Sequence, residues 1–453
     1  MTHERFHYKT LDDVRNAANK LGIELPFARD TKALVEPLVV PGTCVKLSNR
    51  MGIAPMEGAD STPDGLPSDY TVRRYVNEAK GGSALIWFEA ISIVEEGRSS
   101  KTQLLITEKT LEGYKRLVDE VKRAGIEANG FEPYLVLQAN HSGRYSNPGN
   151  VPRPMIAYRH PVLEQYRSAD DSCIVSDDYL KGLEAKFGEA ARLARLAGFD
   201  AIDIKSCHGY LLAELMSAYN RPGEYGGSLE NRTRLLRNGI SAAKAYEDDR
   251  FMVTARVGIY DGYPWPWGFG VEPDGDKTPD YREPVKLVSD LVNGYGLHLL
   301  NLTMGNPYAT THVTRPFDSG KYLPDEHPLV GLARMIGGIG YVKSKVAGAA
   351  IFASAPSYLR QFSDLYSAGA IERGLCDGML FGRLAFADPD FANEVIREGR
   401  INAKRVCLTC GKCGDLIRAH KPTGCVIRDK EVFMPFYKEY LEIKKNQPAN
   451  FRG

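Results

Sequence analysis

Four cysteines near the carboxyl end are the residues whose type and spacing most clearly predict chemistry. Cys407, Cys410 and Cys413 lie in one short segment, and Cys425 follows after a brief excursion of the chain. Four thiolates are the ligand set of both [4Fe–4S] clusters and tetrathiolate zinc sites. Zinc usually takes its thiolates as two separated pairs, so the close triplet mildly favours an iron–sulfur cluster. A metal centre is therefore predicted, and a zinc-stapled tail or a reduced thiol cluster remains open.

The composition limits the remaining functions. The chain has 453 residues, is 43% hydrophobic, and carries 58 basic and 57 acidic side chains, so no bulk charge favours nucleic acid or an anionic membrane. No apolar segment approaches the roughly 18 residues that a membrane-spanning helix needs, and the amino terminus lacks an apolar leader. The other cysteines are scattered, which is typical of a reducing compartment. We expect a soluble cytoplasmic protein that binds neither nucleic acid nor membrane.

Short apolar segments alternate with longer segments of helical periodicity. Continuous hydrophobicity is typical of strands that are buried on both faces of a parallel sheet. The intervening segments, such as 177–197 and 229–246, are long enough to cross back over a sheet. Eight such units predict an α/β fold, a closed (β/α)8 TIM barrel with a cysteine-rich extension at its carboxyl end. The predicted strands are 51–55, 84–89, 134–138, 201–205, 252–257, 297–302, 349–353 and 379–382.

Polar residues follow several of these predicted strands. In TIM barrels the chemistry lies at the carboxyl ends of the strands, so these residues are candidates for a site. They are Met56, Glu57, Glu89, Ala90, Gln138 to His141, Lys205 to Tyr210, Arg256, Gly382 and Arg383.

Several of these segments together resemble the flavin barrel of the old yellow enzyme family of NADH:flavin oxidoreductases. The segments are 49–56, 138–144, 207–212, 220–221 and 225–232, and the resemblance runs from about residue 34 to residue 391. With the tail cysteines added, the chain resembles the iron–sulfur branch of that family, and in particular the amino-terminal part of 2,4-dienoyl-CoA reductase. The same branch contains trimethylamine dehydrogenase.

The resemblance implies an organisation in three parts and two cofactors. Residues 1–33 are expected to form a helical extension, residues 34–400 an FMN-binding barrel, and residues 401–453 a tail that binds a [4Fe–4S] cluster through its four cysteines. The chain shows no strand–GxGxxG–helix unit for a second nucleotide. Electrons are therefore expected from NAD(P)H or from a separate donor protein.

The resemblance also assigns the FMN contacts. Gln138 offers a donor and an acceptor to the pyrimidine edge, and Arg256 can neutralise charge there when hydride arrives. Main-chain groups and small residues suit the flat ring, and a glycine followed by an arginine suits the phosphate. The ring contacts are Ala54, Pro55, Met56 and Ala90, and the phosphate contacts are Gly382, Arg383 and, in place of the glycine-rich turn of many relatives, Ser354.

The segment 205–210 is predicted to carry the catalytic residues. Relatives place two hydrogen-bond donors around the substrate carbonyl oxygen, and His208 matches the second of them. Lys205 stands at the first, where it either contacts substrate or pairs with Glu57 or Glu89. Tyr210 matches the residue that protonates substrate carbon.

The predicted function is an FMN- and [4Fe–4S]-dependent ene-reductase that adds hydride to an activated C=C bond. The insertion 260–269, rich in aromatic residues, forms either a wall for a hydrophobic enone or enoyl substrate or a loop packed on its own rings. Two alternatives stay open. One is an amine dehydrogenase of the trimethylamine dehydrogenase type, and the other is a non-catalytic electron-transfer or zinc-stapled scaffold subunit. Assembly into a homo-oligomer is also left open.

Overall fold

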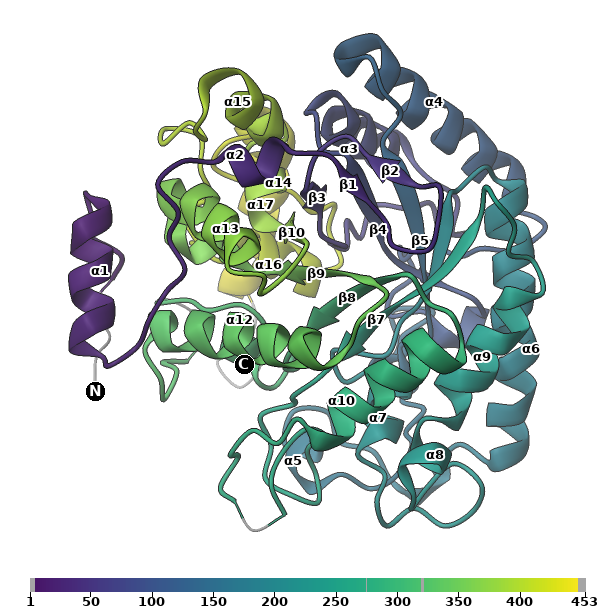
Figure 1. The fold of residues 1–453 in the computed structure, drawn as a ribbon. Coiled ribbons are helices and arrows are strands. Elements are labelled where there is room, and N and C mark those ends of the chain that lie inside the picture. Colours follow the sequence, from purple (N-terminus) through teal and green to yellow (C-terminus); the bar gives the residue numbers. More distant parts are fainter. Residues whose placement is uncertain (1–4, 274, 319–321, 447–453) are drawn as a thin grey trace.

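The computed structural model describes residues 5–273, 275–318 and 322–446. Eight strands close into a barrel in the order β10-β3-β4-β5-β6-β7-β8-β9, and each neighbouring pair is parallel (Figure 1). The predicted (β/α)8 barrel is therefore confirmed. The strands are β3 (Met51–Ile53), β4 (Leu85–Ser92), β5 (Tyr134–Asn140), β6 (Ala201–Ile204), β7 (Met252–Gly258), β8 (Leu299–Thr303), β9 (Ala350–Ser354) and β10 (Gly378–Phe381).

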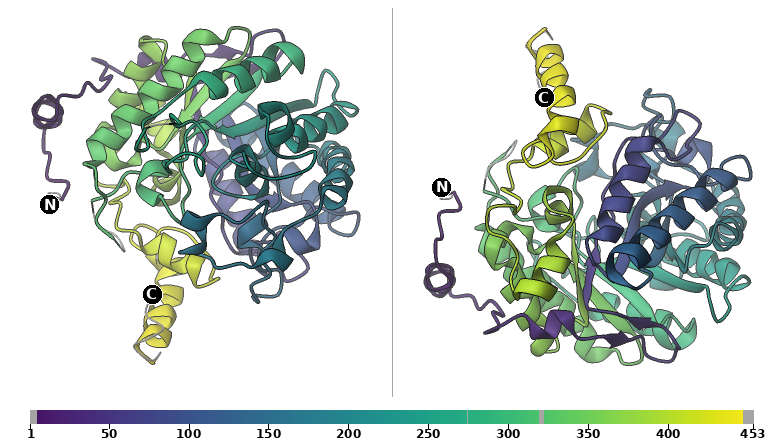
Figure 2. Two further views of the ribbon diagram at one scale, coloured as in Figure 1. Left: turned by 90° about the horizontal axis from the view of Figure 1, so that it is seen from below. Right: turned by 90° about the horizontal axis from the view of Figure 1, so that it is seen from above.

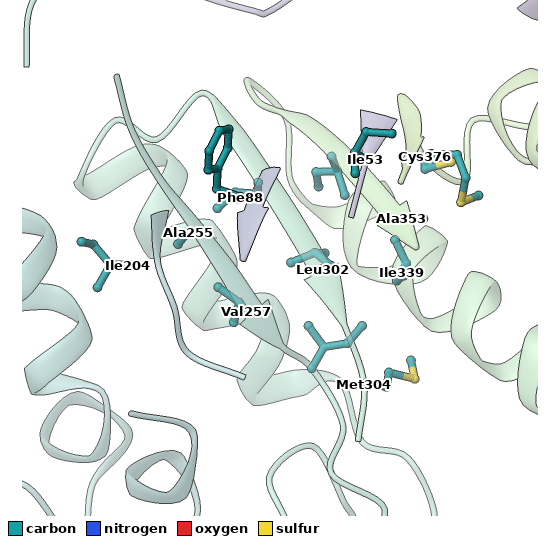
Figure 3. Packing of buried hydrophobic residues seen from close by; sticks show 14 of the residues in the cluster. Ile53, Phe88, Ile204, Ala255, Val257, Leu302, Met304, Ile339, Ala353 and Cys376 are labelled. Atoms are coloured by element: carbon teal, nitrogen blue, oxygen red, sulfur yellow. The ribbon is translucent and has the colours of Figure 1, made fainter. Parts of the chain in front are cut away.

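The strands are apolar throughout because both of their faces are covered. Alternate side chains point to opposite faces of a strand. Trp87 of β4 points into the barrel interior, while its neighbour Phe88 packs in the layer between strands and helices. Figure 3 shows part of this outer layer, including Leu302 of β8 and Ala353 of β9. The two layers together explain the continuous hydrophobicity from which the strands were predicted.

A ring of helices surrounds the barrel (Figure 1). Local signals set several of their ends: the Ser176 hydroxyl accepts a hydrogen bond from the Tyr179 N–H at the start of α6, and Gly130 ends α4 in the left-handed region. The ring contains α3 (Asp69–Lys80), α4 (Leu111–Asn129), α6 (Asp177–Leu196), α9 (Arg234–Lys244), α10 (Arg282–Ser289), α12 (Pro328–Lys345), α13 (Ser363–Glu372) and α15 (Phe391–Glu398).

Shorter elements lie in the loops and at the two ends of the chain. The helices are α1 (Leu11–Lys20), α2 (Lys32–Val35), α5 (Pro161–Glu164), α7 (Leu211–Met216), α8 (Leu229–Arg232), α11 (Thr311–Thr314), α14 (Arg383–Ala387), α16 (Lys412–Arg418) and α17 (Lys430–Asn446). The short helical turns of other types are Glu95–Gly97, Gly143–Tyr145, Asp171–Cys173, Asp290–Gly294 and Pro356–Phe362. The antiparallel strands β1 (Leu38–Val39) and β2 (Lys46–Leu47) pack with the interior residues of the barrel.

The two ends of the chain are attached differently. The amino-terminal segment follows the side of the barrel at α13, where the Ala28 N–H donates to the Leu365 carbonyl at 3.0 Å, and α1 buries Val14 and Ala18. At the other end, α17 projects away from the barrel in both views of Figure 2. Within the described ranges, no helix is long and apolar enough to cross a membrane.

Candidate active site

The loops that follow β3 and β10 meet at the carboxyl end of the barrel. The Ala54 N–H donates to the Phe381 carbonyl at 3.0 Å. A Cβ built on Gly382 would lie 2.9 Å from the Met56 sulfur and 3.5 Å from the Ala54 Cβ. A side chain at position 382 would therefore push against the β3 loop. Two groups of predicted flavin contacts, Ala54 to Met56 and Gly382, thus form one continuous surface.

A buried carboxylate organises the barrel interior below this surface. Asp203 of β6 accepts hydrogen bonds from Trp87 Nε1 and Gln138 Nε2, both at 2.7 Å, and from the Arg256 main-chain N–H at 2.5 Å. Burial raises the pKa of Asp203 to about 6, although these donors oppose the shift. Asp203 therefore orients Gln138 and fixes the backbone of Arg256. Sequence reasoning missed it, although an acidic residue inside the apolar run 201–205 was a usable signal.

Two buried arginines at this end of the barrel have no acidic partner among the described residues. Arg256 Nε and Arg383 Nη1 are buried and make no hydrogen bond there, and Arg383 Nη2 contacts only the Pro316 carbonyl at 3.4 Å. Burial lowers the pKa of Arg256. Burial, followed by the charge of Arg383, lowers the pKa of Arg315. Unpaired buried guanidinium groups are costly, so they fit an anionic ligand such as a flavin and its phosphate.

The remaining predicted cofactor residues lie on the same strands. Ala90 of β4 is paired with Gln138 of β5, and its carbonyl accepts from Gln103 Nε2 at 2.8 Å. Ser354, the last residue of β9, is paired with Leu380 of β10 and is buried. The nine predicted contacts therefore belong to strands β3, β4, β5, β7, β9 and β10 or to the residues that follow them.

The turn after β6 presents the predicted catalytic residues. His208 and Gly209 both have positive φ, of 68° and 69°, and a Cβ on Gly209 would overlap the Asn306 side chain. Only glycine fits that second position without strain or clash. Tyr210 then caps α7, and its hydroxyl lies 2.8 Å from Glu57 Oε1 and 2.8 Å from the Tyr308 hydroxyl.

Lys205 points its ammonium at the Tyr210 ring, with Nζ 4.1 Å from the ring centroid. Burial lowers the pKa of Lys205, although Cys207 and Glu57 oppose the shift. Within the described part of the chain Lys205 makes neither of the ion pairs considered for it, and Glu57 instead accepts from Tyr210. The other carboxylate, Glu89, is held by Arg74 at 2.5 Å and by the Gly58 N–H at 2.9 Å.

His208 lies close to Thr303, with Nε2 3.4 Å from the Thr303 hydroxyl. Burial, helped by the charges of Arg256 and Lys205, lowers the pKa of His208 well below its usual range. The imidazole is therefore neutral at pH 7 and can offer one N–H as a donor. Cys207 is buried and its pKa is raised to about 11 by burial, which fits packing and not a nucleophile.

The aromatic insertion 260–269 packs mainly on itself. Tyr263 and Phe269 are buried, the Phe269 N–H donates to Asp261 at 2.9 Å, and the Trp267 carbonyl lies 2.9 Å from His160 Nε2. Of its large aromatic side chains, Trp265 is the exposed one, at 43%. The insertion is therefore a loop packed on its own residues and on the segment 160–163, and its role as a substrate wall stays a prediction.

The cysteine tail lies against the loop that carries Glu57. The Thr423 N–H donates to the Gly58 carbonyl at 2.7 Å, and Arg73 of α3 makes two hydrogen bonds to Asp429 at 2.7 and 3.1 Å. Burial raises the pKa of Cys407 to about 11, and the charges of Cys413 and Cys425 act in the same direction. The four thiols are thus neighbours. Nevertheless, no three His, Cys, Asp or Glu side chains of the described residues are placed to hold a single metal ion.

Comparison with known proteins identifies the family. Residues 33–273 match the model of the NADH:flavin oxidoreductase / NADH oxidase family. An NADPH dehydrogenase from Clostridium acetobutylicum is 30% identical over 263 residues, which cover 57% of this chain and 71% of that protein. One from Bacillus pumilus is 32% identical over 232 residues, which cover 50% of this chain and 64% of that protein.

Solved structures share the fold. A 2-naphthoyl-CoA reductase complex with 2-naphthoyl-CoA superposes with a TM-score of 0.71 at 19% identity, over 92% of this chain but 59% of that one. The old yellow enzyme from Trypanosoma cruzi gives 0.59 at 19% identity, over 82% and 94% of the two chains. Histamine dehydrogenase from Rhizobium sp. 4-9 gives 0.66 at 20% identity, over 87% of this chain and 52% of that one. The family match and the barrel together show that the chain belongs to the NADH:flavin oxidoreductase / NADH oxidase family, the flavin-dependent oxidoreductases of the old yellow enzyme type.

Proposed function

We propose that this protein is an ene-reductase that adds hydride from reduced FMN to the activated C=C bond of a hydrophobic enone or enoyl substrate. The observation that carries the proposal is the grouping of Lys205, His208 and Tyr210 on one turn, with the Lys205 ammonium 4.1 Å from the Tyr210 ring. An ammonium and an imidazole N–H suit the developing negative charge on a carbonyl oxygen. A phenol suits protonation of the neighbouring carbon.

Oxidation of an amine, as in trimethylamine dehydrogenase, is the alternative within the same family. The fold likeness to histamine dehydrogenase supports this alternative. However, a tertiary amine has no carbonyl oxygen for Lys205 and His208 to bind, and its oxidation does not need a proton donor such as Tyr210. The donor set therefore favours reduction of an activated C=C bond.

FMN fits the residues at the barrel mouth. We propose that Gln138 and Arg256 hold its pyrimidine edge, that Ala54, Pro55, Met56 and Ala90 border its ring, and that Gly382, Arg383 and Ser354 hold its phosphate. The unpartnered Arg256 Nε and Arg383 Nη1 support this assignment, because each is a buried donor that needs an acceptor. FMN, when bound, supplies the hydride. The protein supplies position, charge and the proton.

We also propose that Cys407, Cys410, Cys413 and Cys425 hold a [4Fe–4S] cluster. A tetrahedral zinc ion needs its sulfurs within about 4 Å of one another, whereas a four-iron cube holds its ligands at separate corners, further apart. The charges of these thiols act on one another, so the close triplet and the fourth cysteine lie together as a cluster site requires. The charges of Cys413 and Cys407 act on Arg315, and the charge of Arg383 acts on Cys407. Guanidinium groups beside the thiols suit an anionic cluster.

The electron source, substrate class and setting follow from the same proposal. The matched relatives are NADPH dehydrogenases, so NAD(P)H is one proposed donor, and a separate protein that delivers electrons through the tail is the other. The fold likeness to 2-naphthoyl-CoA reductase supports enoyl thioesters among the substrates.

We assign residues 1–33, 34–400 and 401–453 to the extension, the FMN barrel and the cluster tail. Eight unpaired cysteines fit the cytoplasm.

An anaerobic screen tests this proposal. Prereduced protein is mixed with cyclic enones, steroid enones and enoyl thioesters, and oxidised protein is mixed with secondary and tertiary amines. We expect enones or enoyl thioesters to restore the oxidised flavin spectrum and amines to leave it unchanged. Bleaching of the oxidised flavin by an amine, with no response to the unsaturated compounds, would establish the dehydrogenase alternative.

A further inference from the structure

The Tyr210 hydroxyl has two hydrogen-bond partners and one proton. Glu57 Oε1 and the Tyr308 hydroxyl each lie 2.8 Å from it. Tyr210 donates its proton to the Glu57 carboxyl oxygen. The second contact then has one possible direction, in which Tyr308 donates its own proton to the Tyr210 oxygen. The hydrogen bonds run in one direction, from Tyr308 through Tyr210 to Glu57.

Of the two tyrosines in this chain of hydrogen bonds, Tyr308 is the more exposed. The Tyr308 side chain belongs to a residue that is 40% exposed, whereas Tyr210 is 3% exposed. A proton taken from Tyr210 therefore has a short route for replacement through Tyr308. The Tyr210 ring also lies beside the Lys205 ammonium, at 4.1 Å, the Tyr145 ring, at 6.0 Å, and Ala90.

The position of Tyr308 is fixed by the fold. Its ring stacks on Tyr145 with centroids 3.8 Å apart and planes inclined by 16°, and its N–H donates to Asn306 Oδ1 at 2.9 Å. Asn306 Nδ2 donates to the Tyr145 hydroxyl at 3.0 Å, and Asn306 also closes against Gly209. The loops after β6 and β8 are thus locked together, and the contact between Tyr308 and Tyr210 is part of that packing.

We propose that Tyr308 is a relay residue that passes a solvent proton to Tyr210 while Tyr210 protonates the substrate, a role that rests on the proposed ene-reductase function. Hydride from the reduced flavin forms a C–H bond at the β carbon, and the π electrons move to the carbonyl oxygen. The α carbon then takes the Tyr210 proton as its O–H bond breaks. In the same step the Tyr210 oxygen takes the Tyr308 proton, and Tyr308 then takes one from water. Each turnover consumes one hydride and one solvent proton.

The relay also assigns a role to Glu57 and so accounts for a carboxylate near the proposed flavin site. As an acceptor, it holds the Tyr210 proton in the resting site and leaves the Tyr210 oxygen ready to accept from Tyr308. The carboxylate acts through Tyr210 and is a positioning residue. Lys205, above the same ring, stabilises the transient phenolate by its charge.

The test compares Tyr308→Phe with Tyr145→Phe in the flavin-loaded full chain. Both changes keep the stacked ring pair, and only the first removes a hydroxyl that touches Tyr210. Prereduced protein is mixed with an enone in H2O, in D2O and in mixtures of the two. We expect reoxidation by the enone to slow about tenfold in Tyr308→Phe, less than the hundredfold or more that loss of the acid itself causes. Flavin content and flavin reduction should be unchanged.

The dependence of the rate on deuterium content is the decisive measurement. Two protons in motion give a curved dependence in the wild-type protein and in Tyr145→Phe, and one proton gives a straight line in Tyr308→Phe. A Tyr308→Phe protein that keeps both the rate and the curvature would overturn the relay and leave the ene-reductase function standing. A wild-type protein that no enone or enoyl thioester reoxidises would overturn the function and the relay with it.

Discussion

Tyr210 is the residue on which the two sides of the candidate site meet. Its ring lies under the Lys205 ammonium and beside Ala90, while its hydroxyl faces Glu57 and Tyr308. The side chain is placed by the turn at His208 and Gly209, whose positive φ values depend on the missing side chain at 209. In the proposed reaction, proton transfer therefore depends on one phenol held by contacts from three loops.

Replacement of Tyr210 by Phe should separate the two halves of the reaction. The ring and its packing remain, so flavin binding and flavin reduction by the electron donor should be unchanged. Reoxidation of the reduced flavin by an enone should slow by about a hundredfold or more, because the general acid is gone. Stopped-flow absorbance of each half-reaction measures both. Equal reoxidation rates in Tyr210→Phe and wild-type protein would remove Tyr210 from this role.

Glu57 should be visible in the pH dependence. Burial raises the pKa of Tyr210 well above its usual range, and the negative charge of Glu57 adds to the shift. Tyr210 donates only while protonated, so the rate of reoxidation falls as pH rises through its pKa. Glu57→Gln removes the charge and lowers that pKa, so the alkaline loss should begin at lower pH than in the wild-type protein. The other groups that face Tyr210, Lys205 and Tyr308, are unchanged in this variant.

Glu112→Gln, on the exposed surface of α4, is the matched control and should leave the pH profile in place. If the rate of reoxidation begins to fall at the same alkaline pH in Glu57→Gln and Glu112→Gln, the Glu57 charge does not act on the proton donor.

At the residue scale, sequence reasoning reached the side chains that follow strands but not their partners. Lys205, His208 and Tyr210 were predicted from one segment because they are neighbours in sequence. The contact of Tyr210 with Glu57 joins loops 153 positions apart, and that with Tyr308 joins loops 98 positions apart. Such pairings depend on the register and closure of the barrel, which no local pattern encodes.

At the element scale, the eight strands were predictable because burial on both faces forces continuous apolar sequence. The helices α6 and α9 were predictable for the related reason that one face of each packs on the barrel. The two-residue strands β1 and β2 and the short helices α5 and α7 were not, since elements of two to six residues carry too few positions for a period. The packing of the insertion 260–269 also depends on tertiary contacts with α5.

The junction between α3 and the tail should control how firmly the cysteine segment is held. Asp429→Asn weakens the paired hydrogen bonds from Arg73. Loss of such a pair at a partly exposed site destabilises the junction by about 1 kcal/mol. Local opening of the tail should then expose the Thr423 N–H, and its hydrogen exchange should accelerate about fivefold. Exchange measured by mass spectrometry on peptides that contain Thr423 checks this.

Glu127→Gln, which removes the exposed pair between Arg123 and Glu127 on α4, is the control for a general effect of charge. Unchanged exchange at Thr423 in Asp429→Asn would mean that the tail is held by contacts other than this junction.

At the scale of the whole molecule, the barrel and the tail make separable predictions about content. Protein purified without oxygen should contain about four irons and one FMN per chain. Cys425→Ser should lose iron and keep FMN, because the proposed flavin contacts all belong to the barrel, whereas Cys44→Ser, at an exposed cysteine outside the tail, should keep both. Stoichiometric zinc without iron would contradict the cluster and restore the zinc-stapled tail.

The molecule combines a barrel of the NADH:flavin oxidoreductase / NADH oxidase family with a tail that lies against the loop carrying Glu57. The central proposal is that an activated C=C bond oxidises reduced flavin bound in this barrel. The most direct measurement is a single turnover, in which photoreduced, oxygen-free protein is mixed with an excess of an enone or enoyl thioester and the products are quantified. We predict return of the oxidised flavin spectrum and formation of the saturated product in an amount equal to the FMN oxidised. Flavin that stays reduced, or is reoxidised without saturated product, would contradict it.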